Sequence, residues 1–352
     1  MAINLHKKYS DKLAKIYTHN SFVEGHTNTT WSFSGVKSVL IPSIVTKELE
    51  PYTRSGTNRY GTPTDVQDTM QELTMKMDEG FSLVIDKGDN TEQQMMKNAG
   101  SVMKQQIAER VVPRIDKYAL GEWAKNAGKI ATVSAAPTKN TIIDMLLDAE
   151  VHFADHFIPD GDRWVYMSNA TYKYVRTAAE FAGSDGIINN MIIKGYKGDI
   201  GSLKIVCVPA SYMPQNAYFI AAQKNSVILA QKIRDAQIHQ DPPGISGHLL
   251  EGRYTYDAFV VGTLSDGVYA VVANSAKAAT PTATKGESTT TLASTTGSAT
   301  ILYTLDGTDP RYSNTAITYT AAFTNPTAGT VIKAVASANG VFNSDLLVHT
   351  AA

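Results

Sequence analysis

Apolar residues recur every three or four positions over residues 92–125, which is the pattern of one face of a long α-helix. At 1.5 Å per residue this helix would run about 50 Å, and Pro113 is expected to interrupt or kink it. A second amphipathic helix is predicted over residues 140–156. The first of these helices is far longer than an ordinary globular helix.

Strands predicted from alternation or short apolar runs lie on both sides of these helices. Together with a further helix at 170–181 and a helical turn at 226–231, they indicate an α+β body. The predicted strands cover residues 36–41, 163–167, 202–208, 217–222, 237–239, 255–261 and 268–272.

Residues 47–90 form a polar, glycine-containing stretch with two extended segments. In the second segment Leu73, Met75 and Met77 share one face. An isolated hairpin is marginal in water, and no intrachain cover for this face is evident, so the stretch is expected to pack on another molecule. The candidate intersubunit contacts are Arg54, Arg59, Tyr60, Leu73, Met75, Lys76, Met77 and Phe81.

The chain changes character after Asn274, where a Thr-, Ser- and Ala-rich tail begins; all 11 methionines lie at or before Met213. Alternating segments at 299–305, 316–319 and 331–336, separated by turn residues, predict a small β-sandwich. A disordered linker is the alternative for residues 275–290 only.

The formal net charge of −1 argues against a surface built as a whole to hold nucleic acid or an anionic membrane. The dense basic run is the N-terminal arm, with Lys7, Lys8, Lys12 and Lys15. We expect neither a signal peptide nor a membrane span, and we expect the single Cys207 to be a reduced core residue.

Catalytic motifs are not evident: the sequence has no phosphate-binding GxxxxGK[ST], no GxSxG, no HExxH and no CxxC. His152 and His156 have a spacing that could hold zinc, but no third ligand is evident, and a solvated helix face is the simpler interpretation. We therefore expect no enzyme activity, and we assign no catalytic residue, no cofactor and no metal ligand.

Three strings resemble a subgroup of tailed-bacteriophage coat proteins: RWVYMSNATYKYV (163–175), GDIGSLKIVCVP (198–209) and AQIHQDPPGISGHLLEGRYTYDAFVV (236–261). With the order of arm, extended loop, long helix and α+β body, residues 1–274 resemble the Hong Kong 97-type major capsid protein. The resemblance implies an arm and first strand (1–46), an extended loop (47–90), a spine helix and peripheral domain (91–138), an axial domain (139–233), return strands (234–274) and a surface domain (275–352).

That resemblance implies a protein that self-assembles, as pentamers and hexamers, into the icosahedral shell around double-stranded DNA. Its implied partners are a separate scaffolding protein, a portal, and packaged DNA held by unspecific contact. The arm lysines either make that contact or solvate an arm that clasps a neighbouring subunit. The implied location is the virion capsid, after assembly in the cytoplasm of a bacterial host.

The tail, with SATILYTLDGTDPRYSNTAITYT and GTVIKAVASANGVFNS, resembles the immunoglobulin-like (Ig-like) module at the C-terminus of chitobiase and β-hexosaminidase type enzymes. On a capsid protein this module implies a surface decoration that contacts glycans or host surfaces. The signature residues are Tyr303, Asp306, Gly307, Asp309 and Pro310.

Two other classes of function stay open. The tail alone fits a secreted carbohydrate-binding or glycosidase-associated protein. The arm and loop also fit another virion component, such as a tail-tube protein. The strings in residues 163–261 do not support that class, because they resemble coat proteins.

Overall fold

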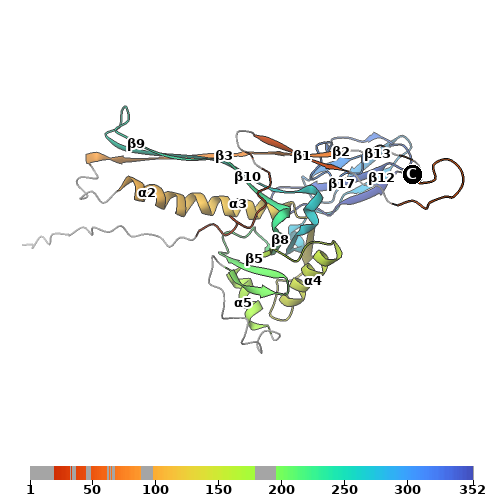
Figure 1. Ribbon diagram of the computed structural model, residues 1–352, viewed down its shortest axis with the longest axis horizontal. Helices are drawn as coiled ribbons and strands as arrows, with labels where there is room; N and C mark the ends of the chain where they lie inside the picture. Colours follow the sequence, from red (N-terminus) through yellow and green to blue (C-terminus); the bar gives the residue numbers. More distant parts are fainter. Residues whose placement is uncertain are drawn as a thin grey trace, which may run out of the picture.

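The structure, a computed structural model, describes residues 20–31, 33, 37–44, 49–61, 63, 65, 68–88, 98–178 and 196–351. A long sheet and a long helix run side by side toward one end of the molecule, and a β-rich module lies near the other end (Figure 1). Between them, a body with β5, α4 and α5 projects to one side. Within the described ranges, no helix is long and apolar enough to cross a membrane.

The helical segments are α2 (Ala99–Gln106), the π-helix η1 (Ile107–Val111), α3 (Val112–Lys125), α4 (Ile142–Asp155), α5 (Asn169–Thr177) and the 3₁₀ turns η2 (Lys224–Ser226), η3 (Gly262–Gly267) and η4 (Asn274–Ala276). The strands of the body are β1 (Ser38–Ile44), β2 (Asp68–Thr74), β3 (Met77–Asp86), β4 (Lys129–Val133), β5 (Arg163–Ser168), β6 (Tyr196–Ile200), β7 (Leu203–Val208), β8 (Ala217–Gln223), β9 (Val227–Gln240), β10 (Gly247–Val260) and β11 (Val268–Ala273). The strands of the module are β12 (Thr282–Lys285), β13 (Thr289–Ala293), β14 (Thr300–Thr304), β15 (Ile317–Thr318), β16 (Phe323–Thr324), β17 (Val331–Ser337) and β18 (Leu347–Thr350).

The predicted long helix is present as one rod, α2–η1–α3, over the described residues 99–125; its expected start at 92 lies outside the described residues. Pro113 has no N–H, and its ring would clash with a carbonyl inside a regular α-helix. The π-helical turn η1 comes directly before, and Pro113 sits in the first turn of α3. The helix therefore changes its hydrogen-bonding pattern at the predicted point and continues.

A six-stranded sheet, in the order β4-β11-β8-β5-β7-β6, has a separate core on each face. Alternation along β5 divides the two cores, because successive side chains point to opposite faces. Tyr166 packs in the cluster that contains Trp123 of α3, whereas Val165 and Met167 pack in the cluster that contains Leu146 of α4. Burial of each such large apolar side chain stabilises the fold by about 1.5–3 kcal/mol.

Two predictions for this region are wrong. The small residues at 127–138 predict a loop, but part of this stretch is strand β4, which pairs in parallel with β11. The helical turn predicted at 226–231 is displaced: the 3₁₀ turn η2 ends at Ser226, and β9 begins at Val227 and pairs with β10. Cys207, by contrast, is a buried free cysteine as expected.

A three-stranded sheet, in the order β3-β10-β9, forms the long projection, which we call the blade. At about 3.3 Å per residue, the 14-residue strands β9 and β10 each extend roughly 45 Å. Of these two strands the sequence predicted only residues 237–239 and 255–261. The β9 residues 234–240 are largely exposed. The other two strands bury side chains at this end of the sheet, where Ile85 and Leu250 pack in one cluster with Met103 of α2.

The C-terminal residues form the predicted β-sandwich, with sheets in the orders β12-β13-β16 and β15-β14-β17-β18. Its core contains Leu292, Ile301 and Tyr303. The disordered-linker alternative for 275–290 is wrong, because η4 and β12 lie in that stretch. We call residues 275–351 the module.

The buried Asp257 of β10 joins three parts of the body. Its carboxylate accepts hydrogen bonds from the Tyr118 hydroxyl on α3 (2.9 Å), the Lys76 amide (2.9 Å) and the Ala258 amide (2.8 Å). Burial, together with the Asp257 carboxylate, raises the pKa of Tyr118, so this hydroxyl stays protonated and donates. Lys76, just after the β1–β2 hairpin, the spine helix α3 and the blade therefore meet at the carboxylate of Asp257.

We expect Tyr118→Phe to lower the free energy of unfolding by about 1.5–3 kcal/mol, because a hydrogen bond to a buried charged group is lost. Urea denaturation of the unassembled chain measures this. Tyr60→Phe, in an exposed loop, is the control and should leave stability unchanged. Equal stability of Tyr118→Phe and the native chain would contradict the role given to Asp257.

Candidate functional site

The strands β1 and β2 pair as a hairpin, and the described residues 49–61 lie in the loop between them. Arg54, Arg59 and Tyr60 are all exposed there, Tyr60 by 88%. The loop has local order, because the Thr53 amide donates to the Arg59 carbonyl (3.0 Å) and the Tyr52 and Tyr60 rings lie 5.0 Å apart. These three predicted contact residues are therefore accessible to another molecule.

Leu73 and Met75 do not fit the expectation that their apolar face lacks a partner within the chain. They are only 3% and 2% exposed, and they pack with Ile228 and Val261 in one cluster. These partners come from β9 and from the residue after β10, far along the chain. The neighbouring Lys76, which points away from this face, is exposed.

Met77 and Phe81 lie on β3, which pairs with β10 and not with β2. Phe81 stands opposite Gly252, where an added Cβ would meet the ring at 2.4 Å, so the phenyl ring covers the glycine. Its ring also stacks near Tyr254 (6.3 Å). Both predicted contact residues are therefore partly buried within their own chain.

Two ion pairs fix β3 to its neighbours along the blade. Arg253 pairs with Asp78 at 2.6 Å, and Arg114 of α3 pairs with Glu79 at 2.8 Å. The hydrogen bond from Arg114, together with that from Tyr256, lowers the pKa of Glu79 despite its partial burial. The pairs are solvent-exposed, so they set register more than they add stability.

The arm residues Lys7, Lys8, Lys12 and Lys15 lie outside the described residues. Their expected contact with DNA stays a prediction.

The signature residues of the module build a turn. Tyr303 is buried and stacks on Phe323 at 4.7 Å. Asp306 accepts hydrogen bonds from the Thr308 amide and from the Thr315 hydroxyl, and Gly307 has the positive φ of 77° that such a turn requires. Partial burial of Asp306 acts to raise its pKa, but these hydrogen bonds outweigh burial and lower it.

The two remaining signature residues belong to the same turn: Pro310 is buried, and Asp309 pairs with Arg311 at 2.7 Å. The side chains of this turn therefore serve contacts within the chain.

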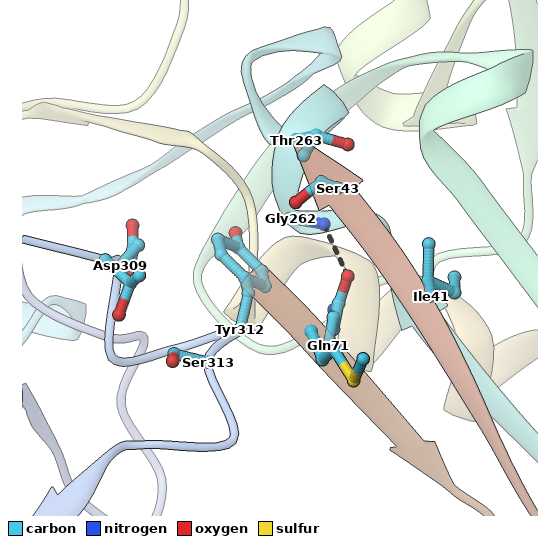
Figure 2. A pocket seen from close by; sticks show the side chains of 10 residues that line it. Ile41, Ser43, Gln71, Gly262, Thr263, Asp309, Tyr312 and Ser313 are labelled. Atoms are coloured by element: carbon cyan, nitrogen blue, oxygen red, sulfur yellow. Dashed lines mark hydrogen bonds between the residues drawn. The ribbon is translucent and has the colours of Figure 1, made fainter. Parts of the chain in front are cut away.

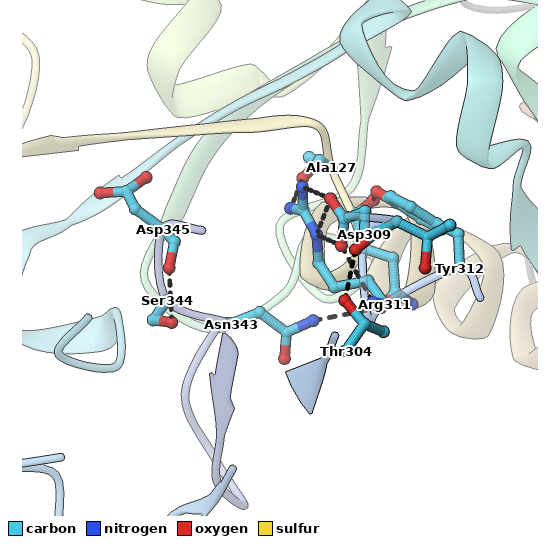
Figure 3. A network of polar contacts seen from close by, with 10 residues as sticks. Ala127, Thr304, Asp309, Arg311, Tyr312, Asn343, Ser344 and Asp345 are labelled. Atoms are coloured by element: carbon cyan, nitrogen blue, oxygen red, sulfur yellow. Dashed lines mark hydrogen bonds and ion pairs between the residues drawn. The ribbon is translucent and has the colours of Figure 1, made fainter. Parts of the chain in front are cut away.

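The module docks on the C-terminal end of the spine helix α3, and Figure 3 shows this polar network. The Arg311 guanidinium donates to the Ala127 carbonyl at 2.8 Å, and the Tyr312 hydroxyl donates to the Asn126 carbonyl. Carbonyls at a helix C-terminus lack partners within the helix, and the helix dipole favours a cation there. The module thus caps the spine helix.

Further contacts seal the same junction. Asn343 donates to the Asn126 side chain (3.2 Å), and Lys277 donates to the Ile130 carbonyl (2.7 Å) and pairs with Asp345 (2.7 Å). Tyr312 and Phe342 belong to the hydrophobic cluster of the body. The change of composition after Asn274 predicts a separate domain, and this domain shares the hydrophobic cluster of the body at the junction.

A cavity of about 240 Å³ lies where β1, β2, η3 and the module meet (Figure 2). Gln71 uses its amide internally, accepting from the Gly262 amide (2.8 Å) and donating to the Val260 carbonyl (3.0 Å). Gly262 lies so close to Tyr312 that an added Cβ would meet the tyrosine Cβ at 2.6 Å. This cavity is the gap left where the β1–β2 hairpin, η3 and the module pack together.

No sequence pattern predicted Arg311, Tyr312 or Asn343 as junction residues. Their position gave a weak indication, because Arg311 and Tyr312 directly follow the signature residues of the module. The sequence also missed a third group near the two helix histidines. Asp266 of η3 lies close to His152 and His156, as a third group that no sequence pattern had placed beside them.

Comparison with known proteins identifies the module and the body separately. A family model described as Fn3 associated matches residues 290–351. A structure from Mycobacterium phage Che8 has a TM-score of 0.61 and 17% identity, covering 77% of this chain and 98% of that chain. No curated protein sequence matches the chain.

Two further structures agree. The capsid of cyanophage P-SCSP1u has a TM-score of 0.62 and 12% identity, covering 77% of this chain and 93% of that chain. The mature capsid of bacteriophage PhiM1 has a TM-score of 0.60 and 12% identity, covering 78% of this chain and 92% of that chain. The chain therefore has the fold of phage capsid proteins and carries an Ig-like module, which confirms the predicted fold class and resemblance.

We expect Tyr312→Ala to undock the module, because it removes a buried ring and a helix-capping hydroxyl. The Lys277 side chain, now 11% exposed at the junction, should then become accessible to trypsin, at least tenfold faster than in the native chain. Limited proteolysis, followed as fragments 1–277 and 278–352, measures the rate. Tyr60→Ala is the matched control, and equal cleavage of Tyr312→Ala and this control would refute the docking.

Proposed function

We propose that this chain is the major capsid protein of a tailed bacteriophage, whose copies assemble as pentamers and hexamers into an icosahedral shell around double-stranded DNA. The observation that carries the proposal is the likeness of its body to phage capsid structures over 92–98% of their chains. In this role the chain is a structural protein and not an enzyme.

The outer face of α4 supports contact between copies. Leu147 and Val151, one helical turn apart, are both exposed, and Phe157 just after the helix is exposed as well. The opposite face of α4 is buried through Ile142, Leu146 and Phe153. Neighbouring apolar side chains on a surface mark an interaction site, so we assign this face to contact between axial domains.

The exposed loop at 49–61 supports the second contact. The loop lies at the end of the β1–β2 hairpin, and its residues Arg54, Arg59 and Tyr60 are exposed and not buried against the body. Tyrosine and arginine are the residue types that interfaces favour. We infer that this loop lies on a neighbouring subunit.

The other partners belong to the same proposal. Packaged DNA would meet the basic arm by salt-sensitive contact without sequence readout. A separate scaffolding protein and a portal would take part in assembly in the bacterial cytoplasm. The module would be displayed on the virion surface, where it would contact a glycan or a host surface.

We expect Val151→Glu to lower the yield of closed shells at least tenfold, because it places a charge in an apolar contact. Electron microscopy and sedimentation of the purified chain, with scaffolding protein if needed, measure the yield. Val348→Glu is the matched control on the module, since Val348 is 59% exposed and Val151 58%.

Circular dichroism should show that both variants are folded. Shells from Val151→Glu at native yield would refute the assigned contact. Tubes from the native chain would favour a tail-tube protein, and monomers under every condition would favour the secreted carbohydrate-binding class; either result would overturn the proposal.

A further inference from the structure

The last turn of α4 and the turn η3 bring together two imidazoles and a carboxylate. His152 lies in α4, His156 is its C-terminal cap residue, and Asp266 lies in η3. Their potential ligand atoms all lie within 4.8 Å of one another. We propose that His152, His156 and Asp266 form a binding site for a zinc(II) ion, with the fourth position left to water.

The hydrogen bonds around the two rings leave nitrogen lone pairs available. The Nδ1 atom of His156 lies 2.8 Å from the His152 carbonyl oxygen, which accepts a hydrogen bond from it and leaves Nε2 as the lone-pair atom. Metal-bound histidines generally donate the other ring N–H in this way. This hydrogen bond favours one tautomer of the His156 ring.

His152 is held against the turn that supplies the carboxylate. Its Nε2 atom lies 3.1 Å from the Asp266 backbone oxygen, so in the donating tautomer Nδ1 carries the lone pair. The two imidazole rings are 4.2 Å apart. Asp266 therefore positions His152 through its backbone oxygen and supplies its own carboxylate as a second ligand.

The spacing fits a zinc ion after a small adjustment. Zinc bonds of about 2.0–2.2 Å in a tetrahedral site hold donor atoms roughly 3.3–3.6 Å apart. The donors here would close by about 1 Å, which rotation of the exposed His156 and Asp266 side chains allows. Lys129 lies near enough to oppose a cation, and the Asp266 carboxylate offsets that charge.

An ion at this place would join two elements of the body, α4 and η3, and η3 is already bonded to the residue before β4. The Gly128 amide, at the entrance to β4, donates to the Ser265 carbonyl of η3 at 3.1 Å. The ion would fasten the end of α4 to the same turn. Binding would therefore stabilise the packing of α4 on the six-stranded sheet, since an ion that binds only the folded state adds to its stability.

Isothermal titration of the full-length chain with zinc chloride tests the site and needs no assembled shell, so it stands apart from the proposed capsid function. We expect one zinc ion per chain. Each of His156→Ala and Asp266→Asn, both at exposed positions, should weaken binding at least tenfold. His239→Ala is the control, because it removes an imidazole that pairs instead with Glu251.

A second measurement guards against misfolded variants. Zinc should raise the thermal unfolding midpoint of the native chain and of His239→Ala, and should leave that of His156→Ala unchanged. Native affinity in both ligand variants would overturn the proposal. It would also be overturned if zinc failed to bind the native chain, or if His239→Ala lost binding as His156→Ala does.

Discussion

A single buried carboxylate, that of Asp257, links the spine helix, the residues after the β1–β2 hairpin and the blade. It accepts from the spine helix through Tyr118 and from the hairpin exit through the Lys76 amide, and it lies within β10 itself. A buried charge without donors would be strongly unfavourable, so these three elements have to meet at this point. The direction of the blade relative to the body follows from that requirement.

The far end of the same helix explains the place of the module. Helix α3 ends at Lys125, and the next two carbonyls receive donors from Arg311 and Tyr312. Because Tyr312 and Phe342 also enter the body core, the module is held by apolar contact as well as by capping. A decoration attached through a flexible linker would need neither contact. The module and the spine helix therefore form one unit.

Local patterns predicted the elements well, and contacts between distant residues poorly. The helical period that includes Ile115 and Trp123 predicted the spine, because one face of that helix is buried. The sequence predicted no partner within the chain for Leu73, because its partner Ile228 comes from β9, in a stretch interpreted as a helical turn. Asp266 and Tyr312 had no pattern to mark them, since each acts through a residue more than 100 positions away.

Electron cryo-microscopy of shells assembled from the full-length chain tests most directly whether body and module form one rigid shell subunit. The account predicts closed shells in which density for the module is as well resolved as density for the end of α3, with loop 49–61 on a neighbouring subunit. Shells with a sharp body and smeared module density would contradict the rigid docking. A loop that contacts only its own subunit would contradict its role in assembly.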